Sequence, residues 1–173
     1  MKACCFTGHR PDKCEFLYDG RSGEFVVLRD ELERAIEGAL DSGVETFYCG
    51  GAWGFDLLAA ETLLSFREKY KFSLVFVVPF EGQESGFPAE WKRRYATVRS
   101  CADEVICLSE SYYRGCYYNR NRYMVDHSDM VIAHYDGSAG GTRNTVNYAE
   151  KQGKPVINVG ERLKNMFNYS FLD

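Results

Sequence analysis

The chain has 173 residues, of which 45% are hydrophobic and 27% charged, and its formal net charge is −4. This composition is typical of a globular protein and excludes disordered and collagen-like chains. The acidic balance also excludes a protein that holds nucleic acid mainly by bulk electrostatic attraction. The longest apolar run, at 74–80, is far shorter than the roughly 20 residues of a membrane span. The N-terminus does not resemble a signal peptide, so we expect a cytoplasmic protein without membrane contact.

Short β-branched and apolar runs alternate with longer amphipathic runs along the whole chain. The apolar runs predict strands at 3–6, 45–49, 73–78, 104–108, 129–135 and 156–159. The amphipathic runs predict helices around 28–40, 57–68, 90–101, 115–127 and 142–152. This alternation predicts a Rossmann-like three-layer α/β/α fold with a mainly parallel sheet.

No linker or repeat divides the sequence, so we expect one domain over 1–173. Its core would span about 1–159, followed by a C-terminal tail at 160–173. The tail is rich in asparagine and aromatic residues, and we expect it to pack on the sheet edge or on another subunit. Whether the protein forms a homo-oligomer therefore stays open.

In such a sheet, ligands bind beyond the carboxyl ends of the strands, so the loops that follow the strands carry the functional prediction. The loop after the first strand contains a dense group of candidate ligand-binding residues. They are Thr7, Gly8, His9 and Arg10. Because hydroxyls, backbone amides and a guanidinium all donate to phosphate, we interpret this loop as one side of an anion site.

The loop after the second strand carries three glycines in five positions and leads into a helix. Backbone amides at a helix start favour an anion, which makes this loop a second candidate wall. The candidate residues are Gly50, Gly51, Ala52, Gly54 and Asp56. Because a carboxylate repels phosphate, we expect Asp56 to bind ribose hydroxyls or to orient the loop. The chain contains neither G-x-G-x-x-G nor a Walker loop.

The loop after the fifth strand is the strongest single element in the sequence. Gly140, Gly141 and Thr142 stand at the start of the last long helix. Paired glycines leave several amides accessible there, and the threonine adds a hydroxyl.

Two further segments supply candidates that lie outside the glycine loops. The helix at 115–127 is rich in arginine, asparagine and tyrosine, which suits planar hydrogen bonding, and we select Asn119 and Arg122 as ligand-binding residues. After the third strand, Phe80 and Trp91 either flank a base or close the core, and both alternatives stay open.

The seven cysteines include no C-x-x-C pair, and several lie in apolar runs. The sequence therefore predicts neither a disulfide framework nor a metal site.

The motifs together resemble a known superfamily. Residues 49–56, with Ala59 and Ala60, resemble the S-G-x-A-x-G-[IF]-D-x-x-A-A pattern of the SLOG superfamily, which includes DprA and the LOG-type phosphoribohydrolases. Residues 140–156 are similar to its second glycine motif and following strand. Segments 6–11, 120–122 and 126–129 look most like the YpsA-like branch.

The resemblance implies a Rossmann-like fold that binds a nucleotide-derived ligand between the two glycine motifs. LOG-type enzymes use a glutamate three residues after the motif threonine, whereas this chain has Thr145 there. No catalytic residue is therefore assigned, and whether the protein is an enzyme stays open.

Three functional hypotheses follow. The first is a protein that binds or senses a small nucleotide-type ligand, such as NAD, ADP-ribose or a nucleoside phosphate. The second is a nucleoside-phosphate N-glycosidase, with Asp56 or Glu61 as acid–base and Arg10 or Arg122 holding phosphate. The third is single-stranded nucleic-acid binding through 92–94, Arg114 and the tyrosines. We favour the first, and the acidic charge weighs against nucleic acid.

Overall fold

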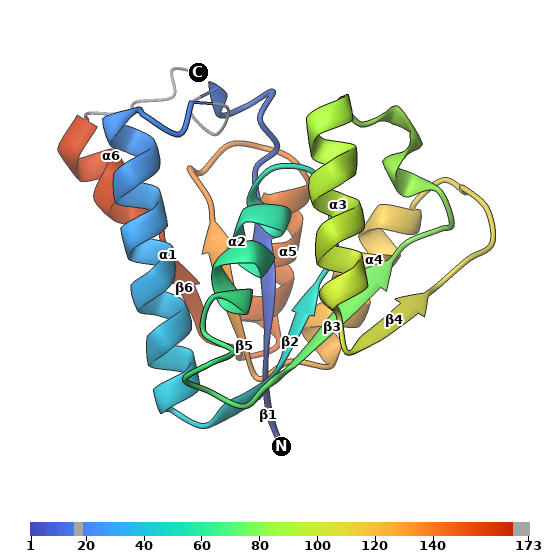
Figure 1. Ribbon diagram of the computed structural model, residues 1–173, viewed down its shortest axis with the longest axis horizontal. Helices are drawn as coiled ribbons and strands as arrows, with labels where there is room; N and C mark the ends of the chain where they lie inside the picture. Colours follow the sequence, from blue (N-terminus) through green and yellow to red (C-terminus); the bar gives the residue numbers. More distant parts are fainter. Residues whose placement is uncertain (16–18, 168–173) are drawn as a thin grey trace.

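The structure is a computed structural model and describes residues 1–15 and 19–167 (Figure 1). Six parallel strands form one sheet in the order β4-β3-β2-β1-β5-β6. The strands are β1 Lys2–Gly8, β2 Val44–Cys49, β3 Ser73–Val78, β4 Glu104–Cys107, β5 Met130–His134 and β6 Val156–Asn158. Every predicted strand is present, and no end differs by more than two residues.

The helices follow the strands in alternation, as the sequence predicts. They are α1 Gly23–Asp41, α2 Phe55–Leu64, the 3-10 helix η2 Gln83–Gly86, α3 Ala89–Cys101, α4 Cys116–Asp126, α5 Gly141–Lys151 and α6 Glu161–Phe167. Buried residues of α1, α2, α3 and α6 form one apolar cluster against the sheet, and those of α4 and α5 form a second. The predicted Rossmann-like three-layer fold is confirmed.

The central strands are apolar at successive positions because both faces of the sheet are covered. In β3, Leu74 and Phe76 belong to the first cluster, whereas Val75 and Val77 belong to the second. Successive side chains of a strand point to opposite faces, so a continuous apolar run supplies both layers at once.

Helix α1 shows how local sequence fixes a helix and its buried face. The hydroxyl of Ser22 accepts a hydrogen bond from the amide of Phe25 at 3.0 Å and caps the N-terminus. Leu28, Leu32 and Ile36 then recur every four residues and are fully buried. This stripe holds α1 against the sheet.

The first residues of the C-terminal tail form a helix. This helix, α6, packs on α1, with Leu163 buried (Figure 1). A nitrogen of the Arg162 guanidinium lies 2.7 Å from a carboxylate oxygen of Glu31. The predicted tail residues 168–173 lie outside the described part of the chain.

The strand order reverses at β1, which lies between β2 and β5. The chain runs from β1 outward to β4 and then returns to the other side of β1 with β5. The loops after β1 and β5 therefore leave the sheet in opposite directions and open a crevice between them. Ligands bind in this crevice in folds of this type. Among the described residues, no helix is both long and apolar enough to cross a membrane.

Candidate functional site

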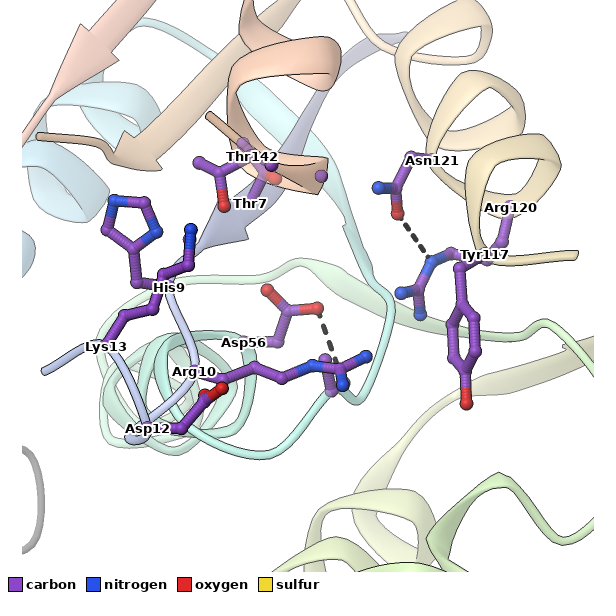
Figure 2. Close-up of a pocket in the computed structure, with 14 residues that line it drawn as sticks. Thr7, His9, Arg10, Asp12, Lys13, Asp56, Tyr117, Arg120, Asn121 and Thr142 are labelled. Carbon is purple, nitrogen blue, oxygen red and sulfur yellow. Dashed lines mark hydrogen bonds between the residues drawn. The ribbon is translucent and has the colours of Figure 1, made fainter. Parts of the chain in front are cut away.

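A cavity of about 270 Å³ occupies this crevice at the carboxyl ends of the strands (Figure 2). Three loops and the first turns of α4 and α5 enclose it. Its lining residues are Thr7, Gly8, His9, Arg10, Asp12, Lys13, Ala52, Asp56, Tyr117, Arg120, Asn121, Gly140, Gly141 and Thr142. Residues 7–13, 52–56 and 140–142, far apart in the sequence, thus face the same cavity.

Nine of the fourteen residues selected from the sequence line this cavity. They are Thr7, Gly8, His9, Arg10, Ala52, Asp56, Gly140, Gly141 and Thr142. The two glycine loops therefore meet across one pocket, which is the arrangement that the sequence interpretation requires.

The other three selected glycines do not line the pocket but are closely packed by neighbouring residues, which leave no room for a Cβ. They are Gly50, Gly51 and Gly54. Gly54 caps α2 with φ of 105°, and a Cβ there would lie 2.9 Å from the carbonyl oxygen of His9. Only glycine tolerates both the backbone angle and this close approach. The first loop can therefore pack directly on the start of α2.

Asn119 and Arg122, selected on α4, do not line the pocket. The Asn119 side chain is exposed and donates to the Tyr113 hydroxyl at 3.0 Å. The Arg122 guanidinium, also exposed, bonds the hydroxyls of Tyr118 and Tyr148 at 3.4 and 3.3 Å. Both residues lie on the outer face of the helix.

The pocket face of α4 is instead formed by Tyr117, Arg120 and Asn121, which the sequence interpretation missed. Their spacing of three and four residues places them on one face, in line with buried Met124 and Val125. Continuing the apolar stripe toward the N-terminus of the helix would have found them. Asp12 and Lys13, also missed, carried no signal beyond their proximity to the first loop.

Contacts of His9 and Lys13 join the first loop to the glycine loop before α5. Nε2 of buried His9 lies 2.8 Å from a carboxylate oxygen of Asp136, and the Lys13 ammonium donates to the Ala139 carbonyl at 2.7 Å. Asp136 also accepts from the amide of Ser138 at 2.8 Å. These contacts hold the residues before α5 against the end of β1.

A hydrogen-bond relay through α4 connects the two glycine loops. Arg120 donates from Nη1 to the Gly50 carbonyl and from Nε to Oδ1 of Asn121 at 2.8 Å. Asn121 donates from Nδ2 to the Thr145 hydroxyl at 3.0 Å, and that hydroxyl donates to the Gly141 carbonyl at 2.9 Å. Two of its links cross between elements: Arg120 ties α4 to the loop after β2, and Asn121 ties α4 to α5. The relay therefore holds the two walls through α4.

Asp56 and Arg120 are the charged groups most deeply buried in the site, with exposed fractions of 5% and 3%. Burial raises the pKa of the Asp56 carboxyl to about 6, although Arg120 and the Ala52 amide act in the opposite direction. Burial also lowers the pKa of Arg120, while the charge of Asp56 opposes that shift. Near neutral pH the Asp56 carboxyl can therefore both accept and release a proton.

The start of α5 supplies positive electrostatic potential on the other wall. Gly140 is the N-cap residue without a side-chain cap, and the first turn contains no acidic residue. The first amides of a helix lack partners within the helix, and its dipole favours negative charge there. With Lys13 beside Gly140, this wall is suited to an anionic group.

His9 of the first loop packs against His134, the last residue of β5. The rings of His9 and His134 are edge to face, with centroids 5.6 Å apart. Burial lowers the pKa of His134 to about 3, and the neighbouring His9 adds to the shift. Burial also lowers the pKa of His9, against the opposing charge of Asp136.

The basic segments proposed for nucleic-acid binding are partly neutralised within the fold. Arg94 forms two hydrogen bonds to Glu61 at 2.7 and 2.6 Å, and Arg99 lies 3.3 Å from Glu81. Glu61, one of the candidate acids, therefore pairs with α3 and does not line the pocket. Within residues 1–15 and 19–167, no group of three potential metal ligands is found.

Known structures share the fold. DNA processing protein A (DprA) from Streptococcus pneumoniae aligns with a TM-score of 0.61 and 19% identity over 90% of this chain and 49% of that one. DprA from Helicobacter pylori, reported for its single-stranded DNA binding mode, aligns with a TM-score of 0.61 and 16% identity over 95% and 72% of the two chains. Identities this low establish a shared fold only, so the absence of nucleic-acid binding in this chain stays a prediction.

Sequence comparisons are more specific. YoqJ, an uncharacterized SPbeta prophage-derived protein of Bacillus subtilis strain 168, is 32% identical over 140 residues, covering 73% of this chain and 82% of YoqJ. A UPF0398 protein of Bacillus velezensis is 27% identical over 168 residues, covering 92% and 91% of the two chains. The model of the YpsA family, described as the YspA SLOG family, matches residues 4–158. The chain belongs to this YpsA family of the SLOG superfamily.

Proposed function

We propose that the pocket binds a small nucleotide-derived ligand, such as a nucleoside phosphate, ADP-ribose or NAD. The observation that carries this proposal is the meeting of the two glycine loops across one cavity at the switch point of the sheet. A site of this kind uses backbone amides and a helix N-terminus to hold phosphate.

The walls of the pocket match the parts of such a ligand. The start of α5 and Lys13 favour a phosphate group, because they combine unpaired amides with an ammonium. Asp56 projects toward the middle of the cavity and is suited to accept hydrogen bonds from ribose hydroxyls (Figure 2).

Calorimetric titration of the purified chain with AMP, ADP-ribose, NAD and unphosphorylated adenosine tests the proposal. We expect a phosphorylated ligand to bind and adenosine to bind at least about tenfold more weakly, because charge-assisted hydrogen bonds to phosphate contribute about 1.5–3 kcal/mol. Lys13→Met should weaken the phosphorylated ligand by a similar factor. Lys92→Met, on the exposed face of α3, is the control and should leave affinity unchanged. Failure of every phosphorylated ligand to bind would refute the proposal.

A second candidate function follows from the protonation of Asp56. A buried carboxyl with a pKa of about 6 inside a ligand pocket has the property of a general acid–base. The corresponding activity is cleavage of the N-glycosidic bond of a nucleoside phosphate. Release of free base that disappears in Asp56→Asn, with nucleotide binding retained, would support it. Retained binding without any base release in the unmodified protein supports binding alone.

A further inference from the structure

Aromatic side chains gather where the pocket opens beside α4. The ring centroid of Phe80 lies 5.5 Å from that of Tyr112 and 5.8 Å from that of Tyr117, and both pairs meet edge to face. Tyr117 lines the pocket, and Tyr112 is 63% exposed. We call Phe80, Tyr112 and Tyr117 the aromatic ledge. Of the two residues whose role stayed open in the sequence, Phe80 lies here, whereas Trp91 is buried in the core.

Arg10 lies over this ledge at the pocket opening. Its guanidinium carbon is 5.4 Å from the centroid of the Tyr117 ring, and its side chain is exposed. In the described part of the chain, the Arg10 side chain forms no ion pair with a carboxylate. A guanidinium in this position stacks readily on a flat ring, so a small shift of this long side chain would admit a planar group against Tyr117.

The residues that suit each part of a nucleotide follow one another across the pocket. Figure 2 shows Lys13 and Thr142 on one side, Asp56 in the middle and Tyr117 on the opposite side. This order corresponds to phosphate, ribose and base. The cavity of about 270 Å³ is slightly smaller than the roughly 300–1,000 Å³ that ligand pockets usually have. Part of a nucleotide must therefore extend through the opening, toward the ledge.

We infer that the aromatic ledge is a base-binding subsite, in which a nucleobase stacks on Tyr117 and is covered by Arg10 on its other face. The inference rests on the proposed function and specifies that the ligand retains its base. Stacking on tyrosine accepts every base because each has a π-face. The recognised chemistry is a nucleoside 5′-phosphate, which a free nucleotide and the 5′-phosphorylated end of a single strand both present.

Calorimetric titration with ribose 5-phosphate and AMP isolates the contribution of the base, because the two ligands share the phosphate and the sugar. We expect AMP to bind about 5- to 150-fold more tightly, as one base–aromatic stack gives. Tyr117→Ala should reduce this ratio to near one and leave ribose 5-phosphate affinity unchanged. Tyr117→Phe should keep the ratio, because the ring and not the hydroxyl makes the contact. Tyr118→Ala, a neighbouring exposed tyrosine outside the pocket, is the matched control.

The outcomes separate this inference from the function on which it rests. Equal affinities of the unmodified protein for AMP and ribose 5-phosphate would overturn the base subsite and leave the phosphate site standing. An equal loss in Tyr118→Ala and Tyr117→Ala would also overturn it. No binding of either ligand would refute the proposed function and the subsite together. A 5′-phosphorylated trinucleotide identifies the source: tighter binding than AMP indicates a strand end, and weaker binding indicates a free nucleotide.

Discussion

The relay from Gly50 to Gly141 predicts a large stability effect from one small substitution, Asn121→Ala. This change removes the acceptor of Arg120 Nε at 2.8 Å and the donor to Thr145 at 3.0 Å. The first bond involves a buried charged group, whose net contribution is about 1.5–3 kcal/mol, and the second is neutral and contributes about 0.5–1.5 kcal/mol. Asn121 is half-buried at the pocket, so water replaces part of both bonds. We expect a loss of about 2 kcal/mol in the free energy of unfolding.

Urea denaturation at pH 7, followed by circular dichroism, measures this loss. For a chain of this length, about 2 kcal/mol corresponds to a decrease in Tm of roughly 4–8 °C. Asn119→Ala is the matched control because it makes the same substitution on the same helix at an exposed position. It should change the free energy of unfolding by less than about 0.5 kcal/mol. Both variants gain the same helix propensity, and Asn119→Ala loses only the exposed hydrogen bond to Tyr113, so their difference reports mainly on the relay.

The result that would refute this reasoning is an Asn121→Ala variant as stable as Asn119→Ala. It would mean that water replaces both bonds fully and that the relay does not hold the walls. Asn121→Asp gives an independent check, because it keeps an acceptor for Arg120 but loses the donor to Thr145. We expect its loss to be smaller than that of Asn121→Ala.

Four further predictions concern pH and backbone geometry. Because burial raises the pKa of Asp56 to about 6, this carboxyl stabilises the fold most at low pH, and the stabilisation is lost as pH rises from 4 to 7. We expect the free energy of unfolding to fall by about 2 kcal/mol over that range. Asp56→Asn should remove this fall, as measured by urea titrations at several pH values. Burial lowers the pKa of His134 to about 3, so its effect on stability runs in the opposite direction with pH. The free energy of unfolding should fall by about 2 kcal/mol as pH decreases from 7 to 5, and His134→Gln should abolish that fall. Gly54→Ala should destabilise the protein by about 2 kcal/mol or more, because its φ of 105° and the nearby His9 carbonyl exclude a side chain. Gly38→Ala in α1, with open space around it, should stabilise it by about 0.5–1 kcal/mol.

A different experimental result would contradict each of these predictions. A difference between Asp56→Asn and the unmodified protein that does not change with pH would contradict the raised pKa. The same finding for His134→Gln would show that this ring can be protonated within the fold. A Gly54→Ala variant as stable as Gly38→Ala would show that the first loop does not need its close approach to α2.

The strands and most helices could be predicted from the sequence because their signals are local. Both faces of the sheet are covered, so the strands read as continuous apolar runs, and the stripe of Leu28, Leu32 and Ile36 repeats every four residues. The glycine loops could also be placed, because a parallel sheet brings the carboxyl ends of its strands to one edge. These features depend only on residues that are close together in the chain.

The pocket face of α4 was decided by the tertiary structure. Where this helix lies on the sheet, its inward face is apolar, with Met124 and Val125. Its first turns line the crevice at the strand ends, and there the same face is polar, with Arg120 and Asn121. Sequence reasoning selected Asn119 and Arg122 for their hydrogen-bonding chemistry, and both lie on the outer face of the helix rather than at the pocket. The change from apolar to polar along one face reflects where the sheet ends, which no local pattern records.

The contacts that close the site also depend on the tertiary structure alone. His9 and Asp136 are 127 positions apart, and Lys13 and Ala139 are 126 apart. The sequence determined which loops carry groups suited to an anion. Only the order of the strands, with β1 between β2 and β5, brought those loops to face each other, because neighbours in a sheet are set by packing and not by distance along the chain.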